Sequence, residues 1–384
     1  MRYLGHISIK RVIALLFVCV IWPLLSILSL NIDNIPGITS KVTLCSLQAQ
    51  SQPKQISLRQ YLLTSNHQLQ EDSLYYFQNP EDSSLYGVKN RQGEIIIPAK
   101  SRLFLNSKLD AAIMEGYIEL PVRKSLRNYN AEAIAIPIRE VYNRQGAFLY
   151  LAQFFDNGSD YFEQGLRRYV DHQKMGFVDR AGNIQIVAQW DFVTPFHYGY
   201  AKVYTGGWKR KVVDKSDEHW TVQPTSQAST SYIINKEGKR VFPVKTANGQ
   251  THNDAPTSIA SDKNYKKKFN TPRPGCIIDG QLYPYPFHYS EKEQRIYHQI
   301  NQNKQLKRYV SKHLYSHPSD IHFEIVESPS RYFPFYILQP YNESTLYGDM
   351  TIYVNVKGDT FYHYESFDEL LTPLQQWLQK PSAF

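Results

Sequence analysis

Three histidines between residues 313 and 322 form the densest group of potential metal ligands in the chain. His313 and His317 are four residues apart, so they would share one face if a helix continued that far. Pro318 ends any helix near that point, and Asp320 is the one carboxylate at a ligand-like spacing. With His322 on a separate segment, the pattern favours a surface cluster over a metal site. We therefore expect no bound metal.

Sequence motifs for catalysis are absent. The chain has no Gly-x-Ser-x-Gly turn, no His-Glu-x-x-His zinc motif and no phosphate-binding glycine loop, since Gly206-Gly207-Trp208 is too short to be one. We therefore predict no catalytic residue and no cofactor, and a role other than catalysis. The alternative is a hydrolase of envelope polymers whose site is assembled from distant residues. A cleft with two facing carboxylates would favour it.

Four aromatic residues alternate with Pro or His after residue 282, namely Tyr283, Tyr285, Phe287 and Tyr289. Alternation with proline predicts an extended backbone with aromatic rings along its faces. Such rings could form a surface that stacks on sugar rings or on a partner chain. The alternative is a strand edge that packs on the C-terminal domain.

A run of basic residues, Lys266, Lys267 and Lys268, lies in a polar stretch from 246 to 273. This stretch is interpreted as a linker or long insertion, or as a basic patch for a polyanion or a membrane surface. The net charge of the chain is +8, and three of its basic residues precede residue 12. The net positive charge left for the rest of the chain is too small to be typical of a nucleic-acid-binding domain. No nucleic-acid partner is therefore expected.

The segment from Val12 to Leu30 carries no charge and follows Lys10 and Arg11 directly. Its length is sufficient for a membrane-crossing helix whose basic flank stays in the cytoplasm. We therefore expect an envelope protein anchored in the inner membrane, with its bulk in the periplasm or outside. If the segment is a cleaved signal, the protein is secreted. The polar residues 31–56 are the expected tether.

Three cysteines are present in the chain. Cys19 lies inside the apolar segment, which leaves Cys45 and Cys276 for the exported part. These two either form one disulfide or remain separate small hydrophobic residues.

Residues 57–245 contain four tetrads that begin with Asn or Asp and end with Gly. The 29 Tyr and 19 Phe of the chain already favour β structure. An Asn or Asp side chain accepts a hydrogen bond from the backbone two residues on, and Gly adopts the left-handed conformation, so each tetrad predicts a β-hairpin turn. The turn glycines are Gly93, Gly146, Gly182 and Gly238. Their irregular spacing indicates insertions, the longest at 209–230.

The third hairpin resembles the WG (KWG) repeat family. It reads Gly-Phe-Val-Asp-Arg-Ala-Gly-Asn-Ile-Gln-Ile-Val from Gly176, followed by Trp-Asp-Phe-Val-Thr-Pro-Phe-His-Tyr-Gly-Tyr-Ala-Lys-Val from Trp190. The resemblance extends over 85–245, with Tyr86 and Met175 where the family has Trp. It implies a β-repeat scaffold that serves as an interaction module and shares no catalytic residues.

Residues beyond 275 show a different pattern. Apolar residues about every fourth position predict an amphipathic helix over 291–314. Ser366 and Glu369 match a capping box for a second helix within 366–378, which Pro373 should kink or restart. Strand-like runs lie between these helices, at 322–326, 333–338, 350–356 and 361–364.

The sequence thus predicts a mainly β chain in five segments. They are a hydrophobic helix at 1–30, a tether at 31–56, an array of antiparallel β-hairpin repeats at 57–245, a linker or insertion at 246–275, and a smaller α+β domain at 276–384. A repeat scaffold without a catalytic motif favours a non-enzymatic envelope protein that binds a protein or a cell-wall component. The identity of that partner and the oligomeric state stay open.

Overall fold

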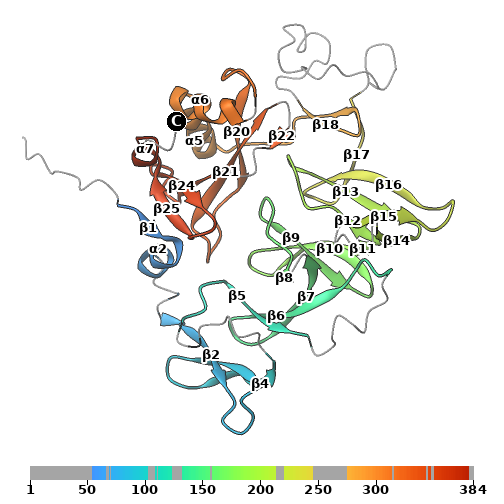
Figure 1. Ribbon diagram of the computed structural model, residues 1–384, viewed down its shortest axis with the longest axis vertical. Helices are drawn as coiled ribbons and strands as arrows, with labels where there is room; N and C mark the ends of the chain where they lie inside the picture. The colour runs from blue at the N-terminus through green and yellow to red at the C-terminus, as the bar shows by residue number, and fades with distance from the viewer. Residues whose placement is uncertain are drawn as a thin grey trace, which may run out of the picture. The chain divides into compact units, whose positions relative to one another are not determined.

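The computed structural model describes residues 54–379, apart from 66–68, 70, 103–108, 110, 123–131, 156–157, 213–219, 245–274, 314, 343–344 and 347–349. The chain divides into two compact units, Met1–Gln52 and Pro53–Phe384, and all described residues belong to the second. The fold is mainly β, with 48% strand, antiparallel sheets and four helices among the described residues (Figure 1).

The repeat region contains four antiparallel units of three strands, each with one of the Asn/Asp-to-Gly tetrads between its last two strands. In every unit the middle strand pairs with both others. The units are β2 (Leu74–Gln78), β3 (Tyr86–Asn90) and β4 (Ile95–Ser101); β5 (Tyr117–Pro121), β6 (Pro137–Asn143) and β7 (Phe148–Phe155); β9 (Leu166–Asp171), β10 (Lys174–Asp179) and β11 (Ile184–Trp190); and β13 (Tyr200–Thr205), β16 (Thr230–Asn235) and β17 (Arg240–Val241).

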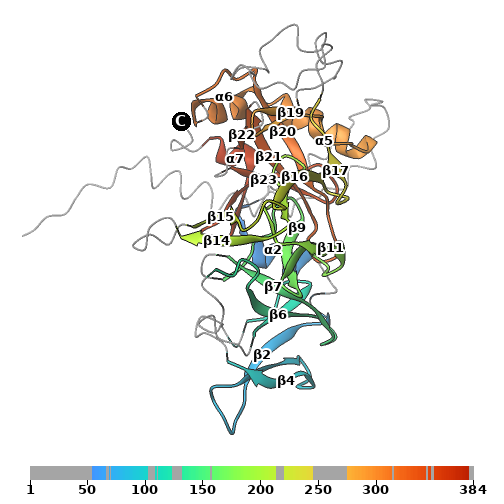
Figure 2. The ribbon, with the colours of Figure 1, turned by 90° about the vertical axis from the view of Figure 1, so that its right-hand side faces the viewer.

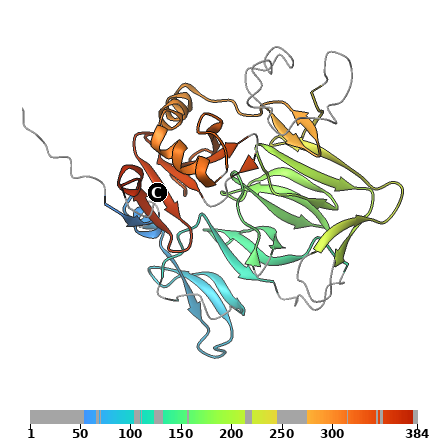
Figure 3. The same ribbon diagram turned by 45° about the horizontal axis from the view of Figure 1, so that its top comes forward.

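Shorter strands extend these units. Strand β7 pairs with β9, which joins the second and third units in one sheet together with β8 (Gly158–Ser159). Strand β12 (Phe192–Val193) pairs with β13. Between β13 and β16 the chain inserts a separate hairpin, β14 (Trp208–Val212) and β15 (Trp220–Pro224), within the stretch where the glycine spacing indicated an insertion (Figure 3).

The four tetrads form the same hydrogen-bonded turn. In the first, Asn90 Oδ1 accepts hydrogen bonds from the backbone N–H of Gln92 at 3.0 Å and of Glu94 at 2.9 Å, and Gly93 N–H donates to the Asn90 carbonyl. The other three repeat these bonds position by position. The structure thus places Gly93, Gly146, Gly182 and Gly238 in turns between paired strands, each with a φ between 75° and 89°.

Consecutive units stack through these turn glycines. A Cβ atom built on Gly146 would lie 2.6 Å from Ile96 O, in the last strand of the unit before it. The next two units repeat this contact, at Gly182 with Leu149 and at Gly238 with Ile186. Gly93 belongs to the first unit, and a Cβ atom built on it would have no atom within 4 Å. Each turn glycine after the first therefore lets one unit approach the preceding one, as in a repeat array.

Gly176, in strand β10, is expected to be the least replaceable strand glycine. A Cβ there would lie 2.4 Å from Ile186 O and 2.6 Å from Ala188 N, where the strand register shifts. Gly176→Ala should therefore lower the free energy of unfolding by about 1–3 kcal/mol, measured by urea unfolding. Gly158→Ala is the control, because nothing lies within 4 Å of a Cβ at Gly158. Equal losses in both variants would contradict the packing shown.

The C-terminal residues form one antiparallel sheet with helices. Its strands are β20 (Ile321–Glu327), β21 (Phe335–Asn342), β22 (Thr345–Leu346), β23 (Thr351–Asn355), β24 (Phe361–Glu365) and β25 (Leu370–Pro373). Its helices are α5 (Glu291–Asn301), α6 (Lys304–His313) and α7 (Leu374–Trp377), and a small hairpin precedes them, β18 (Cys276–Ile278) with β19 (Gln281–Tyr283). Helices α5 and α6 lie against β20 of this sheet (Figure 2). Ile296 and Leu306 of these helices belong to one buried apolar cluster with Phe323 and Leu338 of the sheet.

Three sequence predictions about this part were wrong in detail. The helix expected over 291–314 is two helices, because Asn303 Oδ1 accepts the Leu306 N–H and starts a new helix there. The helix expected within 366–378 forms only after Pro373, where a restart was expected, and its first part is wrong, since Leu370–Pro373 pairs with β24 instead. Strand β1 (Ile56–Ser57), which we expected to open the repeat region, pairs with β25, and α2 (Leu58–Ser65) follows it.

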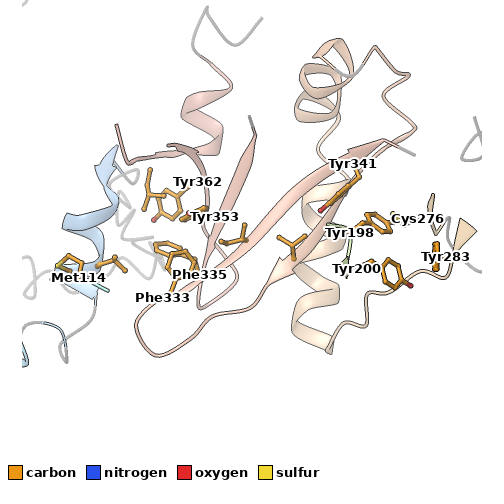
Figure 4. Packing of buried hydrophobic residues seen from close by; sticks show 14 of the residues in the cluster. Met114, Tyr198, Tyr200, Cys276, Tyr283, Phe333, Phe335, Tyr341, Tyr353 and Tyr362 are labelled. Carbon is orange, nitrogen blue, oxygen red and sulfur yellow. The ribbon is translucent and has the colours of Figure 1, made fainter. Parts of the chain in front are cut away.

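A cluster of buried aromatic residues joins the repeat region to this sheet. The Tyr198 ring, in the segment between β12 and β13, lies 4.8 Å from the Tyr341 ring of β21, edge to face. Tyr200, Phe335 and Tyr353 belong to the same cluster (Figure 4). Burial of large aromatic surfaces makes this cluster a main source of stability for the folded part of the chain, Pro53–Phe384.

Several predicted features lie outside the described residues. They are the hydrophobic segment 12–30, the tether up to residue 53, Cys19, Cys45 and the lysines at 266–268. Cys276, whose pairing with Cys45 the sequence left open, is buried with 1% exposure in the aromatic cluster. In the part of the chain that the structure describes, no helix has the length and apolar character needed to cross a membrane.

Candidate functional site

The second position of all four turn tetrads is a basic residue. These turn cations are Arg91, Arg144, Arg180 and Lys236. Arg91 is exposed, whereas Arg144 is 4% exposed and donates to the carbonyls of Ile113 at 3.1 Å and Glu115 at 2.8 Å. The same sequence position therefore serves a buried contact in the later units.

Two turn cations reach the end of strand β20. Arg180 donates to both carboxylate oxygens of Glu327, and its guanidinium lies 4.1 Å from the centre of the Phe333 ring. Lys236 Nζ donates to the carbonyls of Gln164 and Val326, each at 2.7 Å. Charged and polar bonds thus hold the third and fourth units against the C-terminal sheet.

Lys236 should make the stability of the protein depend on pH. Burial lowers its pKa to about 8, from the ordinary value of 10.5. Between these values the unfolded chain binds more protons than the folded chain, so the free energy of unfolding should rise with pH, by up to about 1.4 kcal/mol per pH unit. Urea unfolding from pH 7.5 to roughly pH 8.5 measures the slope, because tyrosines of the unfolded chain, whose ordinary pKa is about 10, remain almost fully protonated there. Lys236→Met should flatten it, and an unchanged slope in that variant would exclude this origin.

A cleft of about 1000 Å³, the carboxylate cleft, lies between the repeat units and the C-terminal sheet. Residues from β5, β9, β23 and the segments around them line it. Its acidic residues are Glu115, Glu119, Asp160, Glu163 and Glu369; its arginines are Arg59, Arg167 and Arg180; and its aromatic residues are Tyr76, Tyr117, Tyr161, Phe162, Tyr353 and Tyr364. Aromatic walls with a few converging charged groups are typical of a binding site for a small ligand.

Arginines fix two of the carboxylates in this wall. Arg167 forms an ion pair with Glu119 at 2.5 Å, and its guanidinium lies 4.6 Å from the Phe162 ring centre and 4.9 Å from that of Tyr117. Asp160 accepts two hydrogen bonds from Arg168, at 2.6 and 2.7 Å. These pairs are nearly buried, so Glu119 and Asp160 are held in place and neutralised.

Glu115 and Glu163 differ from these paired carboxylates. Burial raises the pKa of Glu115, and Glu119 adds to the effect. Burial likewise raises the pKa of Glu163, with Asp160 as the next cause. Glu115 lies in the wall of the cleft, where protein atoms around it reduce its hydration although its surface is open to the cleft, so a ligand can reach it. A carboxyl group with a raised pKa can donate as well as accept hydrogen bonds, which suits a hydroxyl-rich ligand, and it can also act as an acid or base.

Comparison with known families identifies the repeat. A family model described as "WG containing repeat" matches residues 175–207. The chain is a WG-repeat protein. No curated protein and no solved structure matches the chain.

The matched WG repeat begins in β10 and ends just after β13. Met175-Gly176 stands where the family has its Trp-Gly pair, and Gly176 is the close-packed strand glycine described above. Asp191 accepts hydrogen bonds from Lys174 at 2.6 Å and from the Gly207 N–H at 2.8 Å. One carboxylate therefore ties the start of the WG repeat to its end.

One residue of the predicted aromatic surface is buried and the other three are half-buried. Tyr283 is 7% exposed and belongs to the buried cluster, and Tyr285 and Phe287 pack against that cluster. The Tyr285 and Tyr289 hydroxyl groups both donate to Glu324, at 2.6 Å for Tyr285. These contacts agree with the alternative interpretation, in which the residues pack on the C-terminal domain. Tyr285, Phe287 and Tyr289 also line a pocket of about 750 Å³, so a binding surface at these residues stays a prediction.

The three histidines occupy separate positions. His313 ends α6 and contacts the Tyr309 carbonyl at 2.9 Å, and His317 lies 2.8 Å from the Ser319 hydroxyl. His322 is in β20, with its Nε2 3.3 Å from Tyr198 Oη. Within the described ranges, no group of three His, Cys, Asp or Glu residues is arranged to hold a metal ion.

Sequence reasoning missed the turn cations and the carboxylate cleft. The sequence contained a signal for the turn cations, because a basic residue follows Asn or Asp in all four tetrads. The cleft had no such signal. Its carboxylates come from segments around residues 115, 160 and 369, and only the folded chain brings them together.

Proposed function

We propose that this WG-repeat protein is a non-enzymatic binding protein of the cell envelope, and that the carboxylate cleft holds a hydroxyl-rich cell-wall component. In this proposal the four stacked units are degenerate WG repeats, followed by an α+β C-terminal domain. The hydrophobic segment 12–30 anchors the protein in the inner membrane, with the bulk outside the cytoplasm. Accessibility of the chain to protease added to spheroplasts tests the last point.

One observation supports a hydroxyl-rich ligand. The cleft combines the Tyr117 and Phe162 rings with Glu115 and Glu163, whose raised pKa values let them share protons with a ligand. Sugars present apolar ring faces and hydroxyl groups together, so they match walls that alternate rings and carboxyl groups. The described lining of the cleft has five carboxylates and three arginines, so its formal charge is net negative, which disfavours a polyanion there.

Isothermal titration of the full chain in lipid nanodiscs tests the proposal, with a soluble disaccharide peptide from cell wall as the probe. Glu163→Gln and Phe162→Ala should each raise its Kd about tenfold, which corresponds to about 1.4 kcal/mol. Arg91→Gln, on an exposed turn, should leave the Kd unchanged. The free disaccharide and the free peptide, titrated separately, separate glycan recognition from peptide recognition. No binding of any of the three probes would contradict the proposal.

The second candidate is a hydrolase of envelope polymers, because two carboxyl groups with raised pKa values line one cleft. A hydrolase would release new reducing ends or peptides from purified cell wall. Glu115→Gln would then abolish release while the Kd of the probe stayed within a few-fold. A binding protein releases nothing in either form.

A further inference from the structure

A second hollow, the insertion pocket, lies where the inserted hairpin β14–β15 meets the second and third units. Its volume is about 690 Å³. Its apolar lining includes Ile134, Phe155, Phe192 and Trp220, and the Phe192 and Trp220 rings meet edge to face at 5.9 Å. A pocket of this size and lining accommodates a ligand with an aryl or alkyl body.

Two arginines supply the positive charge of the insertion pocket, and they differ in their partners. Each guanidinium nitrogen of Arg168 has an acceptor, because Asp160 accepts from its Nε and Nη2 and the Val193 carbonyl accepts from its Nη1. Arg210 of β14 stacks over Trp220 at 5.0 Å. Its Nε is buried and has no hydrogen-bond partner among the described residues.

The described residues that line the rest of the pocket have no negative charge that could neutralise Arg210. No carboxylate is among the described lining residues. Gln153 is occupied, since it donates to the carbonyls of Ile134 and Phe154 and accepts from the Ile136 N–H. The Arg210 guanidinium thus has no anionic partner among the described residues, and a ligand carboxylate would give it one through a charge-assisted hydrogen bond.

We propose that the insertion pocket binds a small apolar carboxylate, with the carboxylate on Arg210 and the aryl or alkyl body between Phe155, Phe192 and Trp220. This site is separate from the carboxylate cleft and does not depend on what that cleft binds. The hairpin that supplies Arg210 and Trp220 is an insertion between β13 and β16. It therefore adds a ligand site to the repeat scaffold.

Three probes of one shape and different charge test the proposal by isothermal titration: phenylbutyrate, phenylbutanol and phenylbutylamine. The full chain is held in lipid nanodiscs, with empty nanodiscs as the blank. Phenylbutyrate should bind one per chain, with a Kd at least about tenfold below those of the neutral alcohol and the amine. Equal affinity for all three, or no binding of phenylbutyrate up to about 1 mM, would overturn the proposal.

Arg210→Gln should raise the Kd of phenylbutyrate at least about tenfold and leave that of phenylbutanol unchanged. Lys209→Gln is the matched control, because it removes the same charge from the neighbouring residue, which pairs with Glu132 at 2.6 Å and does not line the pocket. An unchanged Kd for phenylbutyrate in Arg210→Gln would also overturn the proposal. If that variant fails to fold, the three probes on the unchanged chain decide alone.

Discussion

Replacing Arg180 by glutamine should lower the free energy of unfolding by about 3–5 kcal/mol. The side chain of Glu327 is 6% exposed and that of Arg180 21%, and the carboxylate receives two hydrogen bonds from the guanidinium. Glutamine cannot neutralise this carboxylate, so a buried charge remains without its counter-ion. Urea unfolding of the full chain measures the loss.

Arg91→Gln is the control for this substitution, since Arg91 has the same turn position in the first unit but is exposed. Its effect should stay within about 0.5 kcal/mol. If both variants lost the same stability, the turn position itself would matter, and the contact with the C-terminal sheet would not. If neither lost any, the arrangement of the third unit against β20 would be wrong.

Asp160→Asn should have an effect of similar size, about 3–5 kcal/mol. Asp160 and Arg168 are each 4% exposed at the side chain, and the carboxylate binds the guanidinium at two points. The neutral amide leaves the arginine charged and buried. The amide has one acceptor oxygen in place of two, so it cannot accept both from Nη2 and from the Nε and backbone N–H of Arg168, which adds to the loss.

A double variant and a surface pair provide the controls for Asp160. In Asp160→Leu with Arg168→Met, both charges are absent, so much of the loss should be recovered. Glu237→Gln breaks the contact with Lys239, a pair whose side chains are 68% and 77% exposed, and should change stability by less than about 1 kcal/mol. A double variant as unstable as the sum of its single changes would contradict a coupled buried pair.

The turns of the fold were accessible from sequence because their chemistry is local. An Asn or Asp side chain that bonds to backbone two and four residues on, with Gly closing the turn, needs no distant partner. The start of α5 is similar, since Ser290 and Glu293 form a capping box within four residues. In both cases a short window of sequence contains the whole interaction.

Features that depend on distant partners were not accessible. Leu370–Pro373 follows a capping-box pattern in sequence, yet it forms a strand because β24 and β1 lie on either side of it. Likewise Glu115 and Glu163 gain their raised pKa values only from the walls that folding builds around them. Tertiary contacts therefore decide both the strand and the candidate site.

Hydrogen–deuterium exchange of the full chain, with and without the disaccharide peptide, tests the ligand site most directly. We expect bound ligand to slow exchange in the segments that line the carboxylate cleft, residues 111–119 and 159–163, and to leave the exposed turn at 90–94 unchanged. Slowed exchange confined to other segments, or no change at saturating ligand, would contradict the cleft as the binding site.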